Sequence, residues 1–158
     1  MRKYYKKLPA KRIGAGSLIF DGMGNVLLVK PSYKKYWSIP GGVVEENESP
    51  KVACCREIKQ EIGITLTNLN FLCVDYTKAT KDKNESLQFI FYVGELNKKQ
   101  LATIKVDGKE INEYRLVNHK QVTRLLGWPE SNLARRWPNC LKALRECKAQ
   151  YLEDGNGV

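Results

Sequence analysis

The sequence is poor in several features that mark whole classes of protein. No apolar run approaches the roughly 20 residues needed to cross a bilayer, so we expect no membrane span. The N-terminus is basic, but no apolar segment typical of a signal peptide follows it directly. Histidine occurs once, as His119, at a predicted helix start, where we expect a structural or exposed side chain rather than a catalyst. No internal repeat, linker or second domain is visible.

Cysteine is present, but not in the patterns that cross-link a small domain or bind zinc. The count of five is odd, two of the cysteines are neighbours, and no Cys-x-x-Cys pair occurs. Free cysteine on an apolar stripe behaves as a small hydrophobe. We therefore expect free thiols and a reducing, cytoplasmic location. The five are Cys54, Cys55, Cys73, Cys140 and Cys147.

The length of 158 residues suits one domain with its own core. We assign residues 13–152 to this single domain, 1–12 to a basic N-terminal segment and 153–158 to a flexible, polar tail. Hydrophobic and charged contents of 42% and 28% are ordinary for a globular protein.

The net charge of +10 is concentrated in part at the N-terminus. Such a cluster attracts polyanions, whether nucleotides, RNA or an acidic membrane surface. A solvated tail that only aids solubility is an equally good interpretation. The excess of positive charge suits a substrate with several phosphates but does not identify one. The basic residues of this segment are Arg2, Lys3, Lys6, Lys7, Lys11 and Arg12.

The order of elements indicates the fold class. Strand patterns occur at residues 13–20, 25–30, 71–76, 87–96 and 110–117. Helices are predicted at 50–62, from Asn118 to Leu126, and from Ser131 onward. In the last helix apolar residues recur at helical spacing, at Leu133, Trp137, Leu141, Leu144 and Tyr151. Strands, one helix, more strands and terminal helices predict a mixed sheet with helices on its faces, an α/β (α+β) sandwich.

The stretch around the first of these helices organises the chain. Gly41 and Gly42 permit a close backbone approach to a ligand. Ser49-Pro50 reads as a helix cap and first helical residue, and Gly63 as the residue just past the helix end.

On this helix Glu57 and Glu61 are four residues apart, so both lie on one face. Like charges at this spacing destabilise a bare helix, and a divalent cation between them would reverse the effect. A solvated acidic face is the alternative. The accompanying glycine loop, Ser-Pro start and Arg56 favour the cation site.

The segment from Gly42 to Ile64 resembles the Nudix box. Gly42, Glu48, Arg56, Glu57, Ile58, Glu61, Gly63 and Ile64 all fall on this motif in register. Gln60 departs from it, because the family usually has a glutamate there. The resemblance implies a Nudix-type α/β/α sandwich with a mixed β-sheet, in which the box forms a loop-helix-loop.

The resemblance also implies roles for these residues. Glu57 and Glu61 would be metal ligands for Mg²⁺ (or Mn²⁺), with a backbone carbonyl of Gly41 or Gly42 nearby. Glu57 is also a candidate for the base that activates water, although in this family the base varies and can lie outside the box. Arg56 would hold an acidic side chain in place, and Glu48 would orient the loop.

Gln60 offers an uncharged oxygen at the metal site. We expect it to ligate, but more weakly than a glutamate, so that one or two ions bind less tightly. Glu110 or Glu113, outside the box, could complete the ligand shell. Surface exposure is the favoured expectation for both.

Substrate contacts are expected in the loop before the glycines. Tyr33 and Lys35 could stack a base and hold phosphate, although an ordinary amphipathic rim is the commoner outcome. We include Trp37 with them, while noting that Trp37 and Ile39 can simply pack under the glycine loop. Gly41 and Gly42 complete the candidate substrate-binding set.

The function that this resemblance implies is hydrolysis of a pyrophosphate bond in a nucleoside diphosphate linked to another moiety. The substrate could be a nucleotide, a nucleotide sugar or a dinucleotide polyphosphate, and a homodimer is common in the family. The alternative is a catalytically weakened domain that binds a nucleotide or RNA. A general nucleic-acid-binding module has no supporting motif.

Overall fold

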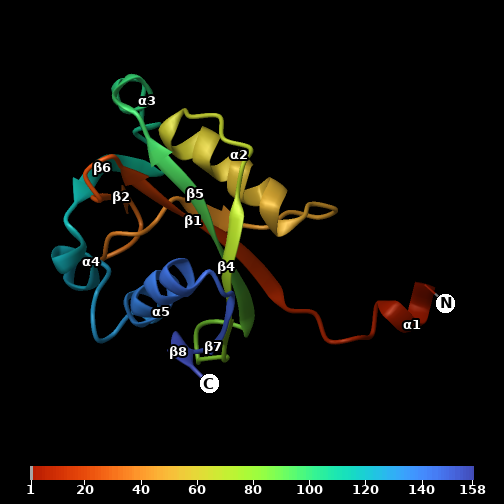
Figure 1. Cartoon of the computed structure of the whole chain (residues 1–158). Coiled ribbons are helices and arrows are strands. Elements are labelled where there is room, and N and C mark those ends of the chain that lie inside the picture. Colours follow the sequence, from red (N-terminus) through yellow and green to blue (C-terminus); the bar gives the residue numbers. More distant parts are fainter. Residues whose placement is uncertain (1) are drawn as a thin grey trace.

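A computed structural model describes residues 2–158 and shows one mixed sheet with helices on both faces (Figure 1). The eight-stranded sheet has the order β6-β2-β1-β5-β4-β7-β8, with β3 paired to β1 outside this path. The strands are β1 (Arg12–Asp21), β2 (Val26–Pro31), β3 (Gly41–Val43), β4 (Asn70–Thr77), β5 (Ser86–Leu96), β6 (Ile111–Val117), β7 (Gln150–Glu153) and β8 (Asn156–Gly157).

The centre of the sheet is a parallel pair, β1 and β5, flanked by antiparallel neighbours. β1 is buried from Gly14 to Ile19, so both of its faces are covered, as expected for a central strand. β3 is short and runs antiparallel to β1, with Ala15 opposite Gly42 and Gly16 opposite Gly41. This pairing sets the glycine loop directly beside the central strand.

Five helices accompany the sheet. They are α1 (Arg2–Tyr5), α2 (Pro50–Ile62), α3 (Lys98–Ala102), α4 (His119–Leu125) and α5 (Asn132–Glu146). α2 covers one face and α5 the other, while residues 2–11 extend away from the sheet (Figure 1).

Two apolar cores separate the three layers. One joins the sheet to α2 and includes Ile19, Leu27 and Ile58. The other joins the opposite face to α4 and α5 and includes Leu28 and Trp137. The alternation of inward side chains along β1 and β2 supplies both cores, because successive residues of a strand face opposite sides. The predicted α/β/α sandwich with a mixed sheet is therefore confirmed.

The C-terminus differs from the predicted flexible tail. Residues 150–157 form a hairpin in which β7 pairs parallel to β4 and β8 returns antiparallel to β7. Asp154 and Gly155 make its two-residue turn, with φ of 50° and 84°. Positive φ at both central residues is typical of a hairpin turn, and Asp-Gly is a preferred sequence for it. The domain limits of 13 and 152 stay a prediction.

One further expectation is corrected, and one helix is added. Tyr151 does not belong to the last helix, because α5 ends at Glu146, the next residue, Cys147, has a left-handed φ of 49°, and Tyr151 lies in β7. The region 97–108, which shows no clear periodicity, contains α3, capped by a reciprocal pair of bonds between Asn97 and Gln100.

The remaining global expectations concern membranes, thiols and the N-terminal segment. Within residues 2–158 no helix is both long and apolar enough to cross a bilayer. All five cysteines are free. Met1 of the basic N-terminal segment lies outside the described residues.

Candidate active site

The helix that carries the two glutamates is fixed at both ends by the residues predicted for this purpose. The Ser49 hydroxyl accepts a hydrogen bond from the Val52 amide, and Pro50 opens the helix. At the other end Gly63 has a φ of 75° and donates its N–H to the Lys59 carbonyl. These caps set the two ends of α2, and its buried apolar residues, which include Cys54 and Ile58, set the face that packs on the sheet.

Glu57 and Glu61 both reach the glycine strand β3 from this face. The Gly41 N–H donates to Oε2 of Glu61 at 2.8 Å. A Cβ atom at Gly42 would lie 2.4 Å from Oε1 of Glu57, so any side chain there would collide with the carboxylate. The absence of a side chain at Gly42 therefore leaves room for the Glu57 carboxylate beside the strand.

Arg56 holds the acidic residues around the helix start. Its Nε and Nη2 donate to the two carboxylate oxygens of Glu48 at 2.8 and 2.9 Å. Its Nη1 donates to Glu57 at 2.7 Å, and Nη2 also bonds the carbonyl of Val43 at 3.0 Å. The hydrogen bonds from Arg56 lower the pKa of Glu48 to about 2. The guanidinium thus joins the loop, β3 and Glu57 into one unit.

Gln60 shares a donor with Glu57, because Nη1 of Arg56 bonds both side chains. Its side-chain oxygen accepts a hydrogen bond from Arg56 at 3.1 Å, and it is not among the residues that line the cavity described below. Glu57 and Glu61 line the cavity and Gln60 does not, so we centre the candidate ligand set on the two glutamates, and the weaker ligation expected of Gln60 stays a prediction.

Glu61 is the most deeply buried of the acidic residues near β3, with 6% of its surface exposed. Desolvation raises the pKa of its carboxyl to about 8, and the Gly41 N–H and Lys34 oppose that rise. Glu57 is less buried and is paired with Arg56. A buried carboxylate with a single hydrogen bond is a group that gains from a bound cation.

The donors at this place fit a hard divalent cation. Two carboxylates and the backbone carbonyls of Gly41 and Gly42 are all oxygen ligands, the type that Mg²⁺ takes together with substrate phosphates. Because Gly42 has no side chain, β3 leaves room here for the Glu57 carboxylate. In residues 2–158 no group of three or more His, Cys, Asp or Glu side chains is arranged to hold a metal, so substrate oxygens and water would have to complete any shell.

A cavity of about 1450 Å³ opens beside these glutamates. It is lined by Glu57 and Glu61 and by all five candidate substrate-binding residues, Tyr33, Lys35, Trp37, Gly41 and Gly42. Tyr33 is largely exposed at the rim. Lys35 lies 3.7 Å from Glu130 and 4.8 Å from the centre of the Tyr36 ring, so it also belongs to the rim. Trp37 is half-buried and packs on the core below.

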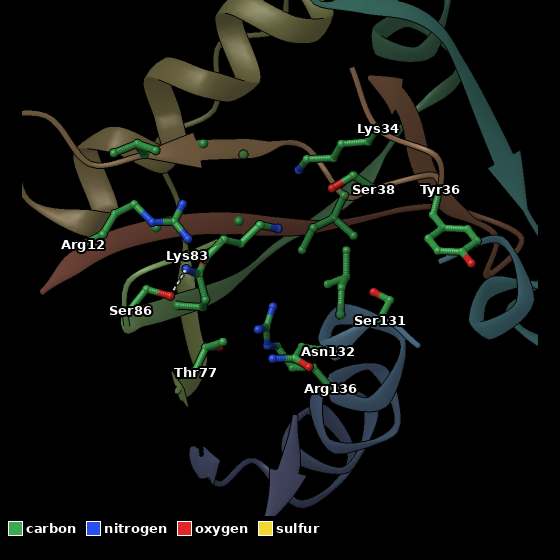
Figure 2. A pocket seen from close by; sticks show the side chains of 18 of the residues that line it. Arg12, Lys34, Tyr36, Ser38, Thr77, Lys83, Ser86, Ser131, Asn132 and Arg136 are labelled. Atoms are coloured by element: carbon green, nitrogen blue, oxygen red, sulfur yellow. Dashed lines mark hydrogen bonds between the residues drawn. The ribbon is translucent and has the colours of Figure 1, made fainter. Parts of the chain in front are cut away.

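Several lining residues lie outside the candidate substrate-binding set. Figure 2 shows Arg12, Lys34 and Lys83 reaching into the open space from three different segments. Arg136 and Thr77 line the opposite side, from α5 and the end of β4. The basic N-terminal segment already pointed to Arg12. Lys83, Thr77 and Arg136 were missed because each stands in a different part of the sequence, and only the fold brings them together.

Of the three remaining candidate residues, one lines the cavity and two do not. Glu110 lines the cavity, whereas Glu113 lies outside it and bonds Arg115 at 3.1 Å. His119 is exposed at the start of α4 and does not line the cavity. Both Glu110 and Glu113 are exposed, as expected.

Comparison with known sequences identifies the protein family. The family model for the NUDIX domain matches residues 10–137. The chain is 37% identical over 62 residues to an 8-oxo-dGTP diphosphatase of Proteus vulgaris, a match that covers 37% of this chain and 55% of that protein. It is 36% identical over 67 residues to mRNA-decapping enzyme subunit 2 of Saccharomyces cerevisiae, covering 42% of this chain and 6% of the relative. The chain thus spans about half or less of these relatives.

Solved structures agree on the fold. A MutT protein from Methanosarcina mazei superposes with a TM-score of 0.68 at 24% identity, covering 90% of this chain and 99% of that one. The NUDIX domain of Shewanella oneidensis NrtR, complexed with ADP ribose, gives a TM-score of 0.70 at 15% identity. This match covers 90% of this chain and 97% of that one. At these identities the likeness concerns the fold alone.

Proposed function

Because the chain belongs to the Nudix family, we propose that it hydrolyses a pyrophosphate bond in a nucleoside diphosphate linked to another moiety, with Mg²⁺ or Mn²⁺ as cofactor. One observation carries the proposal. Glu57 and Glu61 meet at the Gly41-Gly42 strand on the wall of a cavity that also receives several cationic side chains.

The chemistry explains why these groups belong together. A water molecule that attacks a phosphoryl group meets negative charge, so catalysis depends on positioning and charge neutralisation. Arg12, Lys34 and Lys83 point into the cavity and supply fixed positive charge for phosphate oxygens. A divalent cation held by the carboxylates would neutralise further charge and make water more acidic.

The protein's own residues have separate roles in this proposal. Glu57 and Glu61 would hold the cation together with a main-chain carbonyl of the glycine strand. Arg56 positions Glu57 through the bond at 2.7 Å and fixes Glu48 by two parallel bonds. Glu57 is our candidate for the carboxylate that accepts a proton from the attacking water.

The relatives support a phosphoanhydride substrate but not a single one. Three of the relatives are named for 8-oxo-dGTP, for mRNA decapping and for RNA pyrophosphate hydrolysis. Each match is partial, so nucleotides, nucleotide sugars, dinucleoside polyphosphates and RNA 5′ ends all belong in a first screen.

The test is phosphate release from this panel in the presence of Mg²⁺, with a chelator as blank. We expect turnover by the natural sequence and a loss of at least about 100-fold in Glu57→Gln and in Glu61→Gln. Glu46→Gln, which changes an exposed carboxylate in the preceding loop, is the matched control and should remain active. Unchanged turnover in Glu57→Gln would overturn the assignment.

A binding domain without catalysis is the second candidate. Gln60 in place of a glutamate and the net charge of +10 favour it. In that case nucleotides or RNA should bind with no turnover of any member of the panel. We further propose a cytoplasmic location, which suits the five free thiols, and a homodimer.

A further inference from the structure

A buried ion pair stands in the cavity wall at the first turns of α5. Asp75 is fully buried, and Arg136 is 6% exposed. Nε and Nη2 of Arg136 donate to Oδ2 of Asp75 at 2.8 and 2.6 Å. The other carboxylate oxygen, Oδ1, accepts the N–H of Gly155 at 3.0 Å. The guanidinium is therefore held rigidly by β4 and by the C-terminal hairpin.

This pair leaves donors of the guanidinium unused. An arginine has five N–H groups, and two of those of Arg136 are bonded to Asp75. Nη1 makes no hydrogen bond to any of residues 2–158, although Arg136 lines the cavity. Figure 2 shows its guanidinium projecting from α5 toward the open space below Lys83. Thr77, on the same side, carries a buried hydroxyl that has no partner in the described part of the chain.

The charges in the cavity indicate what these donors could bind. Asp75 already neutralises Arg136, whereas Arg12, Lys34 and Lys83 form no ion pair with residues 2–158. Phosphate groups should therefore go to these three side chains. The paired guanidinium is better suited to an uncharged acceptor, because a second anion beside Asp75 would be repelled.

The adjoining wall is apolar. Ile39, Ile90 and Leu133 line the cavity between the glycine strand and α5. Ile39 and Ile90 meet above Gly16, where a Cβ atom would lie 2.9 and 3.3 Å from their Cδ1 atoms. An apolar wall with a few fixed donors at one edge is the usual form of a site for a flat heterocycle.

We propose that Arg136 reads the base of the nucleotide substrate and selects a purine that offers two neighbouring acceptors. Guanine and hypoxanthine present O6 and N7 side by side, and arginine bonds this edge with two donors. Adenine presents its N6 amino group at the same edge, where donor would face donor. A fixed donor left unpaired in a buried site discriminates strongly between ligands. The inference rests on the proposed function, since it assumes that the cavity receives a nucleotide.

The first experiment compares bases in the natural protein. kcat/KM is measured with Mg²⁺ for GTP, ITP and ATP, and the affinities of GMP, IMP and AMP are measured calorimetrically without metal. We expect guanosine and inosine compounds to be preferred over adenosine compounds by about 5- to 100-fold in both measurements. Inosine should match guanosine because it lacks only the 2-amino group.

The second experiment assigns the preference to Arg136. The double variant Arg136→Gln with Asp75→Asn removes both charges together, so no buried charge is left unpaired. It should lose most of the preference for guanosine and inosine over adenosine. Arg145→Gln makes the same change at an exposed position of α5 and should keep the preference. Thermal melting checks that both variants are folded, and the comparison of bases in the natural protein does not depend on them.

The possible failures are distinct. Equal turnover of all three triphosphates, or a preference for ATP, overturns base reading and leaves hydrolysis standing. No turnover of these triphosphates or of any other member of the substrate panel, with tighter binding of GMP and IMP than AMP, overturns hydrolysis and supports base reading. No turnover of the whole panel with equal or absent binding of the three monophosphates overturns both.

Discussion

Gly42 and Glu57 share a space that only one side chain can occupy, because a Cβ atom on Gly42 would lie 2.4 Å from Oε1 of Glu57. We predict that Gly42→Ala displaces the Glu57 carboxylate and lowers kcat at least about 10-fold, since small displacements of a catalytic group are costly. The melting temperature should change little, because the atoms that must move are the carboxylate at the end of the flexible Glu57 side chain.

The matched control is Gly22→Ala, where a Cβ atom would meet nothing within 4 Å. Its activity and melting temperature should equal those of the natural protein. Full activity in Gly42→Ala would show that the position of Glu57 beside the strand does not matter.

We predict that Glu61 lowers the unfolding free energy of the protein although hydrolysis requires it. It is 6% exposed and, within residues 2–158, bonded only to the Gly41 N–H, so above its raised pKa of about 8 its charge is buried without a cation. In metal-free buffer at about pH 9 we expect Glu61→Gln, which keeps an acceptor for Gly41, to gain on the order of 1 kcal/mol of unfolding free energy. For a chain of this size that is about 2–4 °C in melting temperature.

Glu57→Gln is the comparison for this prediction. It removes an ion pair with Arg56 and should melt at the same temperature as the natural protein or below it. Both variants should be inactive. A lower melting temperature for Glu61→Gln than for the natural protein contradicts the prediction.

Glu48 should make the stability of the protein fall in acid. Its pKa is lowered to about 2 by hydrogen bonds from Arg56. A lowered pKa stabilises the fold above the ordinary value of 4.5, and this contribution is lost as the pH falls toward 2. The natural protein should therefore melt above Glu48→Gln at pH 7, and the difference should shrink between pH 4.5 and 2.

Glu45→Gln tests whether this effect needs direct contact. Glu45 lies 3.9 Å from Nη1 of the same arginine and is mostly exposed, whereas Glu48 lies at 2.8 Å and is mostly buried. Exposed ion pairs contribute little. Equal pH profiles for the two variants would count against the special role of Glu48.

The turn of the C-terminal hairpin should matter for stability. Gly155 has a φ of 84°, and a Cβ atom there would lie 2.6 Å from the Asn132 carbonyl and 2.8 Å from Arg135. We expect Gly155→Ala to cost about 2–3 kcal/mol in urea denaturation, from backbone strain and the clash together. Gly24→Ala, at a φ of 81° with open space around it, should show the strain alone and cost about 1 kcal/mol.

The sequence predicted those parts of the site that depend on local signals. The ends of α2 follow from Ser49, Pro50 and Gly63, and the four-residue spacing of Glu57 and Glu61 within that helix puts both on one face. The central strands could be predicted because their apolar runs are long. These features need no knowledge of how distant segments pack.

Other parts depend on packing between distant segments or on weak local signals. Asp75 and Arg136 are 61 residues apart in sequence, and nothing near either one indicates the pair. The hairpin at 150–157 was missed because its strands are short and polar, although Asp154-Gly155 is a recognisable turn. The capping pair of Asn97 and Gln100 could likewise have indicated α3.

The brevity of β8 has a consequence for how copies of the protein meet in concentrated solution. The sheet ends there in only two residues, Asn156 and Gly157, so the outermost strand offers few open amides and carbonyls to a neighbouring molecule. Long edge strands with unpaired backbone groups pair with strands of other molecules and lead to aggregation. An edge strand of two residues, next to a tight turn, should resist such pairing.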